Sequence, residues 1–215
     1  MPLDIKICGL KTPEALEAAL AGGASHVGFI FFAKSPRNIE PAAAGVLRGA
    51  AKGRAQAVAV TVDADDAFLD AIVAAMGPDM LQLHGKETPE RVAQVKARYG
   101  LPVIRALSVS EAGDLEKASA FAGVADRLLF DAKPPKGSEL PGGNGVSFDW
   151  TLLRALPAGT DYLLSGGLNA GNVGEALRLA NPPGLDVSSG VESAPGVKDV
   201  ALIRGFFDAV EAARR

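Results

Sequence analysis

The sequence is poor in the residues that bind metals or form disulfides. Its 215 residues include one cysteine, Cys8, and two histidines, His26 and His84, which lie far apart. One cysteine cannot form an internal disulfide, and no His, Cys, Asp and Glu residues share the spacing of a metal site. We therefore expect no metal site. A cytoplasmic location is also expected, because no basic segment followed by an apolar signal core begins the chain.

Two further absences exclude other classes of partner. The formal net charge is -3, and Lys and Arg are scattered rather than gathered into a basic stripe, so we expect no nucleic-acid partner. No apolar run approaches the roughly 20 residues that span a bilayer, so we expect no membrane association. What is present is ordinary for a folded protein with a sizeable core, since 48% of residues are hydrophobic and 22% are charged.

Short apolar segments alternate with segments of helical periodicity along the whole chain. Thr12-Pro13 and Thr88-Pro89 each provide a helix N-cap followed by proline at the first helical position. The segment HVGFIFF is almost continuously apolar, as strands of a parallel sheet are. The predicted strands are residues 3–9, 26–32, 57–62, 80–84, 103–107, 127–130, 162–165 and 185–188. The predicted helices are residues 12–20, 41–51, 68–73, 88–99, 110–122, 150–156, 169–179 and 199–213.

Eight strand-and-helix units of near-constant length predict an α/β fold with a parallel sheet. In a chain of this length they predict one (β/α)8 TIM-barrel domain over residues 1–215, without a second domain. An open doubly wound sheet is the structural alternative, but no strand is an obvious polar edge strand. Barrel chemistry lies at the carboxyl ends of the strands. The long loops at residues 33–40 and 133–146 are therefore expected to supply a substrate clamp and a lid. For residues 133–146 the alternative is a flexible surface loop.

Two reactive side chains end predicted strands. Cys8 is a candidate nucleophile or general base if a nearby cation favours its thiolate, and Lys6 lies on the same strand face. The alternative is a plain buried cysteine. Asp131 ends the apolar segment RLLF, and a partly buried carboxyl can hold a proton and act as a general acid. Its alternative is a structural ion pair with Lys133 or Arg105.

Glycine turns follow the last two predicted strands. The segments SGGL, residues 165–168, and SSGVE, residues 188–192, let backbone N–H groups approach an anion. Because barrels often bind phosphate between their seventh and eighth loops, the two turns together predict a phosphate site. Arg37 lies in the long second loop, where its planar guanidinium can pair with a carboxylate or a phosphate. A solvated surface arginine is the alternative.

Three more polar residues lie near strand ends. His84 ends the fourth strand, with Gln82 on the same face, and either it orients a substrate hydroxyl or it is a structural histidine. Asp63 is expected to cap the third helix. Asp186 lies inside the eighth strand and is expected to brace the barrel or the phosphate turn.

An ordered set of motifs runs from one end of the chain to the other. KICGL, GFIFFAKSPR, LQLHG, LLFDAK, PGGNG, LSGGLN, DVSSGVES and PGVKD follow one another in this order. In these motifs the chain resembles the phosphoribosylanthranilate isomerase family of tryptophan biosynthesis. The resemblance implies an Amadori rearrangement of N-(5-phosphoribosyl)anthranilate to the 1-deoxyribulose 5-phosphate derivative, without metal or organic cofactor.

The resemblance also implies roles for residues. Asp131 is implied to be the general acid that opens the ribose ring, Cys8 the general base that removes the C2 proton, and Arg37 the partner of the anthranilate carboxylate. The remaining candidate substrate-binding residues are His84 and, at the phosphate, Gly166, Gly167, Ser189 and Gly190.

Several alternatives stay open from sequence alone. One is another sugar-phosphate isomerase or epimerase, and a second is a broader-specificity relative that also accepts an imidazole carboxamide ribotide. A third is a non-catalytic sensor of phosphoribosyl ligands, because a barrel fold alone does not separate enzyme from sensor. The only expected partner is a small phosphoribosyl substrate, and the chain can be a monomer or a homodimer.

Overall fold

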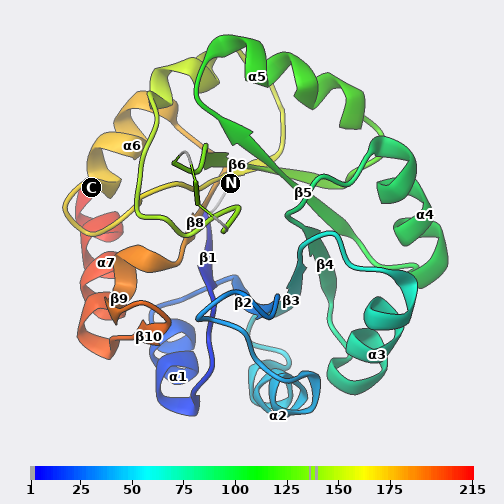
Figure 1. The fold of residues 1–215 in the computed structure, drawn as a ribbon. Helices are drawn as coiled ribbons and strands as arrows, with labels where there is room; N and C mark the ends of the chain where they lie inside the picture. Colours follow the sequence, from blue (N-terminus) through cyan, green and yellow to red (C-terminus); the bar gives the residue numbers. More distant parts are fainter. Residues whose placement is uncertain (1–2, 136, 139) are drawn as a thin grey trace.

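The strands of the computed structural model form a closed parallel barrel in chain order (Figure 1). Strand β1 pairs with β2 on one side and with β8 on the other, which closes the sheet. This confirms the predicted (β/α)8 architecture and excludes the open sheet. The structure describes residues 3–135, 137–138 and 140–215. The strands are β1 (Asp4–Cys8), β2 (His26–Phe31), β3 (Gln56–Thr61), β4 (Met80–Leu83), β5 (Val103–Val109), β6 (Arg127–Ala132), β7 (Tyr162–Leu164) and β8 (Gly184–Val187).

Helices surround the barrel, and their starts follow the predicted capping chemistry. The Thr12 and Thr88 hydroxyls accept hydrogen bonds from backbone N–H groups in the first turns of α1 and α4. The α-helices are α1 (Pro13–Ala21), α2 (Pro41–Ala51), α3 (Asp66–Met76), α4 (Pro89–Tyr99), α5 (Ala112–Glu116), α6 (Val173–Ala180) and α7 (Val200–Ala213). The 3-10 helices are η1 (Lys117–Phe121), η2 (Trp150–Ala155) and η3 (Ser189–Val191).

Some local predictions were wrong. Asp63 does not cap α3, because Asp65 accepts the capping hydrogen bond from Phe68 N. The Asp63 carboxylate instead accepts a hydrogen bond from the backbone N–H of Lys86, and its own backbone has φ of 48°. The helix expected from residue 169 begins at Val173, after an Asn turn. The expected helix over residues 110–122 is divided into α5 and η1.

The last unit adds a hairpin that was not expected. Strands β9 (Glu192–Ala194) and β10 (Val197–Lys198) pair antiparallel between η3 and α7. They lie beside α7 in Figure 1. No helix among the described residues is long and apolar enough to cross a membrane.

A buried ion pair lies among apolar side chains in the barrel interior. Lys6 on β1 is fully buried, and its Nζ lies 2.7 Å from Asp186 Oδ1 on β8. The hydroxyl of Ser165 donates to the other carboxylate oxygen of Asp186 at 3.1 Å. Asp186 therefore stabilises the barrel, which is one of the two roles that the sequence predicted for it. The apolar residues inside the barrel are Cys8, Val58, Val60, Met80, Ile104, Ala106, Leu129 and Leu163.

We predict that Lys6→Met destabilises the protein by about 3–5 kcal/mol, because it leaves the Asp186 carboxylate buried without its cation. The double variant Lys6→Met/Asp186→Asn should recover much of this loss, since the amide carries no charge and still accepts from Ser165. Urea unfolding of the three proteins measures both effects. Equal stability of the single and double variants would contradict the assigned role of the ion pair.

Candidate active site

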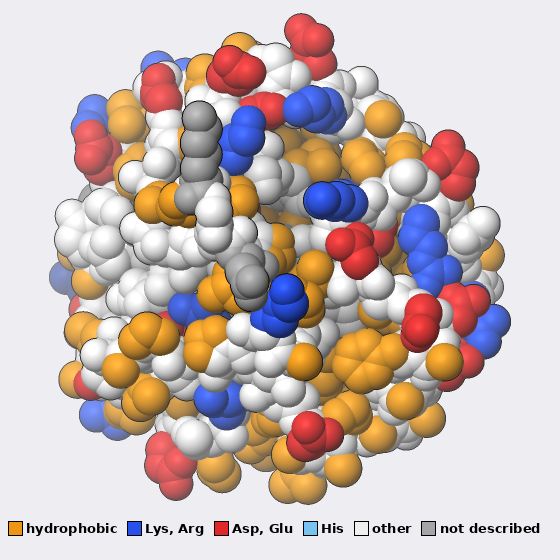
Figure 2. All heavy atoms as spheres, viewed as in Figure 1, with side chains coloured by type: hydrophobic (Ala, Val, Ile, Leu, Met, Phe, Trp, Pro, Cys, Tyr) orange, Lys and Arg blue, Asp and Glu red, His pale blue; other side chains and the backbone are white. Residues whose placement is uncertain are grey.

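One cavity opens at the carboxyl ends of the strands and gathers most of the predicted site residues. It is lined by residues from β1, β6 and β8, by the loop after β2 and by the glycine turns. Figure 2 shows the same face of the molecule as Figure 1, and Lys and Arg side chains lie singly around it rather than in one patch. The predicted residues that line the cavity are Cys8, Arg37, His84, Asp131, Gly166, Gly167 and Ser189.

The thiol of Cys8 lies at this cavity with a lysine beneath it. Burial raises the pKa of the Cys8 thiol, and the nearby Lys6 ammonium counteracts part of this rise. At neutral pH the thiol form is therefore dominant, and the thiolate is a strong base when it forms. A methyl group added at Gly28 would lie 2.9 Å from Cys8 Sγ and 3.2 Å from Lys6 Cε. Sequence reasoning missed Gly28, although a glycine inside an apolar strand signals a close approach.

The carboxyl group of Asp131 is buried and faces an imidazole. Asp131 Oδ2 lies 3.4 Å from His84 Nε2, and Asp131 Oδ1 accepts a hydrogen bond from Ala132 N at 2.9 Å. The amide nitrogen of Gln82 lies 2.9 Å from His84 Nδ1. The alternative pairing of Asp131 with Arg105 is wrong, because Arg105 pairs with Glu87 at 3.1 Å and donates to two backbone carbonyls.

The glycine turns after β7 and β8 lie against each other at the mouth. Gly166 and Gly167 have φ of 91° and 65°, a conformation that L side chains rarely adopt. A side chain at Gly190 would collide with the carbonyl oxygen of Leu168, so the second turn packs on the first. Close backbone packing of this kind needs glycine.

Arg37 is buried and held by a carboxylate that sequence reasoning missed. Its Nε and Nη2 donate to the two carboxylate oxygens of Glu192 at 2.8 and 2.9 Å. Lys198 Nζ lies 2.6 Å from Glu192 Oε1. Burial works against the charge of Glu192, but Arg37 and Lys198 lower the pKa of its carboxyl overall. Glu192 thus binds the guanidinium edge formed by Nε and Nη2. The other edge, formed by Nη1 and Nη2, faces the loop that contains Gly143.

We call residues 133–146 the lid, and its described residues that line the cavity are Leu140, Pro141, Gly142, Gly143, Asn144 and Val146. Lys136 and Glu139 of this predicted lid lie outside the described residues. The carbonyl of Gly143 accepts a hydrogen bond from Arg37 Nη2 at 3.2 Å. A methyl group added at Gly142 would lie 2.5 Å from Asp131 Oδ2 and 2.8 Å from His84 Nε2. The lid therefore packs directly on the acidic residue and on the arginine.

The cavity combines a group that can donate a proton with a group that can accept one, on different strands of the barrel. Together with the glycine turns that suit a phosphate, this defines an isomerase of the sugar-phosphate class, which moves protons without transferring a chemical group. Comparisons with known proteins identify the family.

Residues 5–209 match the family model "N-(5'phosphoribosyl)anthranilate (PRA) isomerase". The isomerase of Mesorhizobium japonicum is 75% identical over 100% of this chain and 98% of its own, and that of Brucella canis is 70% identical over 98% and 95%. The crystal structure of phosphoribosyl anthranilate isomerase from Thermotoga maritima is 32% identical, with a TM-score of 0.87 over 98% of this chain and 100% of its own.

A further solved structure is a phosphoribosyl anthranilate isomerase in complex with reduced 1-(o-carboxyphenylamino)-1-deoxyribulose 5-phosphate. It is 30% identical, with a TM-score of 0.85 over 98% of this chain and 100% of its own. The chain belongs to the N-(5'-phosphoribosyl)anthranilate isomerase family, and its activity is this isomerisation in tryptophan biosynthesis. This family membership excludes two alternatives that the sequence left open, a different sugar-phosphate isomerase or epimerase and a non-catalytic sensor.

We predict that the thiol of the folded protein titrates above the ordinary pKa range of a cysteine thiol, because burial is the largest influence on its pKa. The ultraviolet absorbance of the thiolate, followed as pH rises, measures this directly, since Cys8 is the only cysteine. Cys8→Ser supplies the baseline. A midpoint below the ordinary pKa range of a cysteine thiol would show that the Lys6 charge outweighs burial.

We predict that Gly142→Ala lowers kcat/KM by about 10- to 100-fold, because displacing the lid by a fraction of an ångström disturbs Asp131 and His84 together. Gly205→Ala is the matched control, since a methyl group there meets nothing within 4 Å. Steady-state kinetics on both variants test the lid contact. A Gly142→Ala enzyme as active as the control would show that the lid does not pack on these residues during turnover.

Proposed function

We propose that Asp131 and Cys8 are the acid and the base of the Amadori rearrangement. Asp131 protonates the ring oxygen of the ribose as the C1–O bond breaks, while the lone pair of the anthranilate nitrogen forms a C1=N bond. The thiolate of Cys8 then takes the C2 proton, and the C–H electrons form an enolamine that tautomerises to the ketone. The observation that carries this proposal is that both groups line one cavity together with the glycine turns.

The high thiol pKa suits the second step of this proposal. The positively charged iminium formed by ring opening acidifies the C2 proton, so a small fraction of thiolate is enough. A thiolate that is difficult to form is also the stronger base once formed. The ring-opening step therefore prepares the substrate for the base that the barrel provides.

Two anchors for the substrate are proposed, both lining the cavity that holds the acid and the base. Gly166, Gly167, Ser189 and Gly190 would hold the phosphate, and the open edge of Arg37 would hold the anthranilate carboxylate. The carbonyl of Gly143 now accepts from that edge, so a carboxylate there would replace it. His84 would face the ribose from β4. This assignment keeps Arg37 in the role expected for it, with Glu192 fixing its orientation.

Three further properties are part of the proposal. Residues 1–215 form one domain that needs no metal or organic cofactor. A cytoplasmic location suits a reaction that depends on a free thiol, since oxidising compartments convert thiols to disulfides. The site residues all come from one chain, so both a monomer and a homodimer fit. A Thermotoga maritima relative is described as dimeric.

The proposed roles predict that Cys8→Ala and Asp131→Asn each lower kcat by about 10²- to 10⁴-fold. The loss of anthranilate fluorescence on mixing chelator-treated enzyme with fresh phosphoribosylanthranilate measures the rate. Asp126→Asn is the matched control, because Asp126 precedes β6 at the opposite end of the strand. Both variants should still bind the reduced product analogue, which shows that they are folded. Near-normal turnover by either variant would refute its assigned role.

A further inference from the structure

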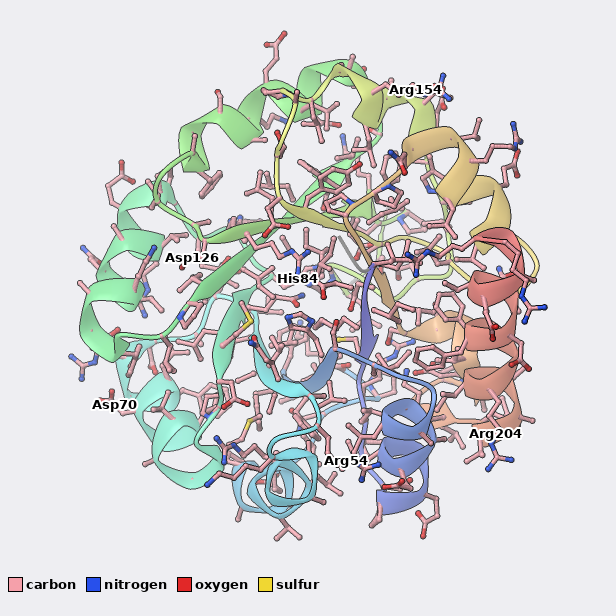
Figure 3. All side chains as sticks on the ribbon, turned by 180° about the vertical axis from the view of Figure 1, so that it is seen from behind. Arg54, Asp70, His84, Asp126, Arg154 and Arg204 are labelled. Carbon is pink, nitrogen blue, oxygen red and sulfur yellow. The ribbon has the colours of Figure 1, made fainter. Side chains whose placement is uncertain are left out.

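Two polar side chains lie next to Asp131, and the roles proposed above give Gln82 no part in the chemistry and His84 only a contact with the ribose. Gln82 on β4 is fully buried, and His84 follows the same strand. With Asp131 on β6 they form a row in which Gln82 Nε2 lies 2.9 Å from His84 Nδ1, and His84 Nε2 lies 3.4 Å from Asp131 Oδ2. Figure 3, seen from behind, shows His84 near the centre of the barrel.

The electrostatics of Asp131 require a partner. Its carboxyl group is 4% exposed, and a buried carboxylate is costly unless a cation compensates it or a proton neutralises it. Among the described residues, the ion-pair partner within 4.0 Å of Asp131 is His84. Histidine is the side chain whose ordinary titration lies closest to neutral pH. One proton shared by this pair satisfies both the burial of Asp131 and its need for a proton as an acid.

The amide of Gln82 is suited to either protonation state of the imidazole. With the NH₂ group toward Nδ1, the other ring nitrogen carries a hydrogen and donates to an ionised Asp131. With Oε1 toward a protonated Nδ1, His84 can be a cation, or its Nε2 can accept from a protonated Asp131. The two amide orientations have the same shape. In the observed orientation Gln82 Oε1 is buried without a hydrogen-bond partner, which leaves it available for the second state.

We propose that His84 is a positioning residue that shares the catalytic proton with Asp131, and that Gln82 selects the ring tautomer by rotation of its amide. This rests on the proposed role of Asp131 as the general acid. In the ring-opening step the shared proton moves through Asp131 Oδ2 to the ring oxygen, which takes the electron pair of the breaking C1–O bond. This leaves a carboxylate and a neutral imidazole whose hydrogen is on Nδ1, and exchange of that hydrogen to Nε2 through solvent, with rotation of the Gln82 amide, gives the orientation in which His84 Nε2 donates to Asp131. Each turnover then transfers one proton from the Cys8 thiol back to the pair through solvent.

Other charged groups border the pair, so a single pH profile cannot assign a titration to it. They line the same cavity and the adjoining one above β3 to β5. They are Cys8, Arg37, Asp186, Lys34, Asp63, Lys86 and Arg105. Variants that change the imidazole without changing these groups are therefore needed.

The deciding variant is His84→Gln, whose amide can donate a hydrogen bond to Asp131 but cannot take up a proton. We expect kcat to fall about 10- to 100-fold with little change in KM. We also expect the alkaline limb of the kcat–pH profile to differ between the parent and His84→Gln, because the parent shares the proton between an imidazole and a carboxyl and the variant has only the carboxyl. If kcat and the alkaline limb of its pH profile are both unchanged in His84→Gln, His84 only donates a hydrogen bond to Asp131 and the proposal is overturned.

A second measurement reads the tautomer directly. The chain has two histidines, so the ¹⁵N signals of His84 can be assigned by their loss in His84→Gln. We expect Gln82→Met to change the ratio of the two ring tautomers and to lower kcat, while binding of the reduced product analogue confirms folding. An unchanged tautomer ratio in Gln82→Met would overturn the role of Gln82.

The parallel Asp131→Asn variant separates the two hypotheses. If Asp131→Asn is active, the proposed function of Asp131 fails and this inference fails with it. If Asp131→Asn is inactive and His84→Gln behaves as the parent enzyme, the acid stands and only the shared proton is refuted.

Discussion

The buried ion pair between Lys6 and Asp186 joins the closure of the barrel to the chemistry at its mouth. The two residues lie opposite each other where β1 pairs with β8, so the pair lies across the seam that closes the sheet. Burial works against the Lys6 ammonium, but Asp186 and Cys8 raise its pKa overall. The same cation therefore stabilises the seam and moderates the cost of forming a thiolate directly above it.

A second buried network joins the last strand to the first two units. Glu192 binds Arg37 of the loop after β2, and Lys198 of the hairpin binds both Glu192 and Ser188. Ser188 in turn donates to the backbone carbonyl of Cys8 at 3.1 Å. Each buried charge in this network has an opposite charge within hydrogen-bond distance, which is the condition under which such groups are tolerated. The hairpin thus holds the Arg37 guanidinium and strand β1, which carries the Cys8 thiol, in fixed positions relative to each other.

The sequence alone was sufficient to predict the barrel and to place at its mouth the residues that directly end a strand. Strand periodicity is local, and a reactive side chain at a strand end must lie at the mouth once the barrel closes. Cys8, His84 and Asp131 were found for this reason. Glu192 was missed because its partner Arg37 is 155 positions away in the chain, and no local pattern connects them. The capping error at α3 arose because two aspartates, Asp63 and Asp65, stand close to one helix start.

Exclusion of water by the lid has two opposite effects on Asp131 and Cys8. A lid that packs on Asp131 excludes water, which strengthens electrostatic interactions in the site but makes an ionised carboxyl or thiol more costly. Under the proposed roles, ring opening resolves this conflict. The acid becomes a carboxylate at the moment when the substrate becomes an iminium cation, so the new negative charge acquires a positive partner within the cavity. The thiolate of Cys8 is attracted by the same cation, and removal of the C2 proton then neutralises both. The reacting groups therefore carry one net negative charge throughout, on the thiolate at the start and on the carboxylate at the end, and the proton returns from the thiol to the acid before the next turnover.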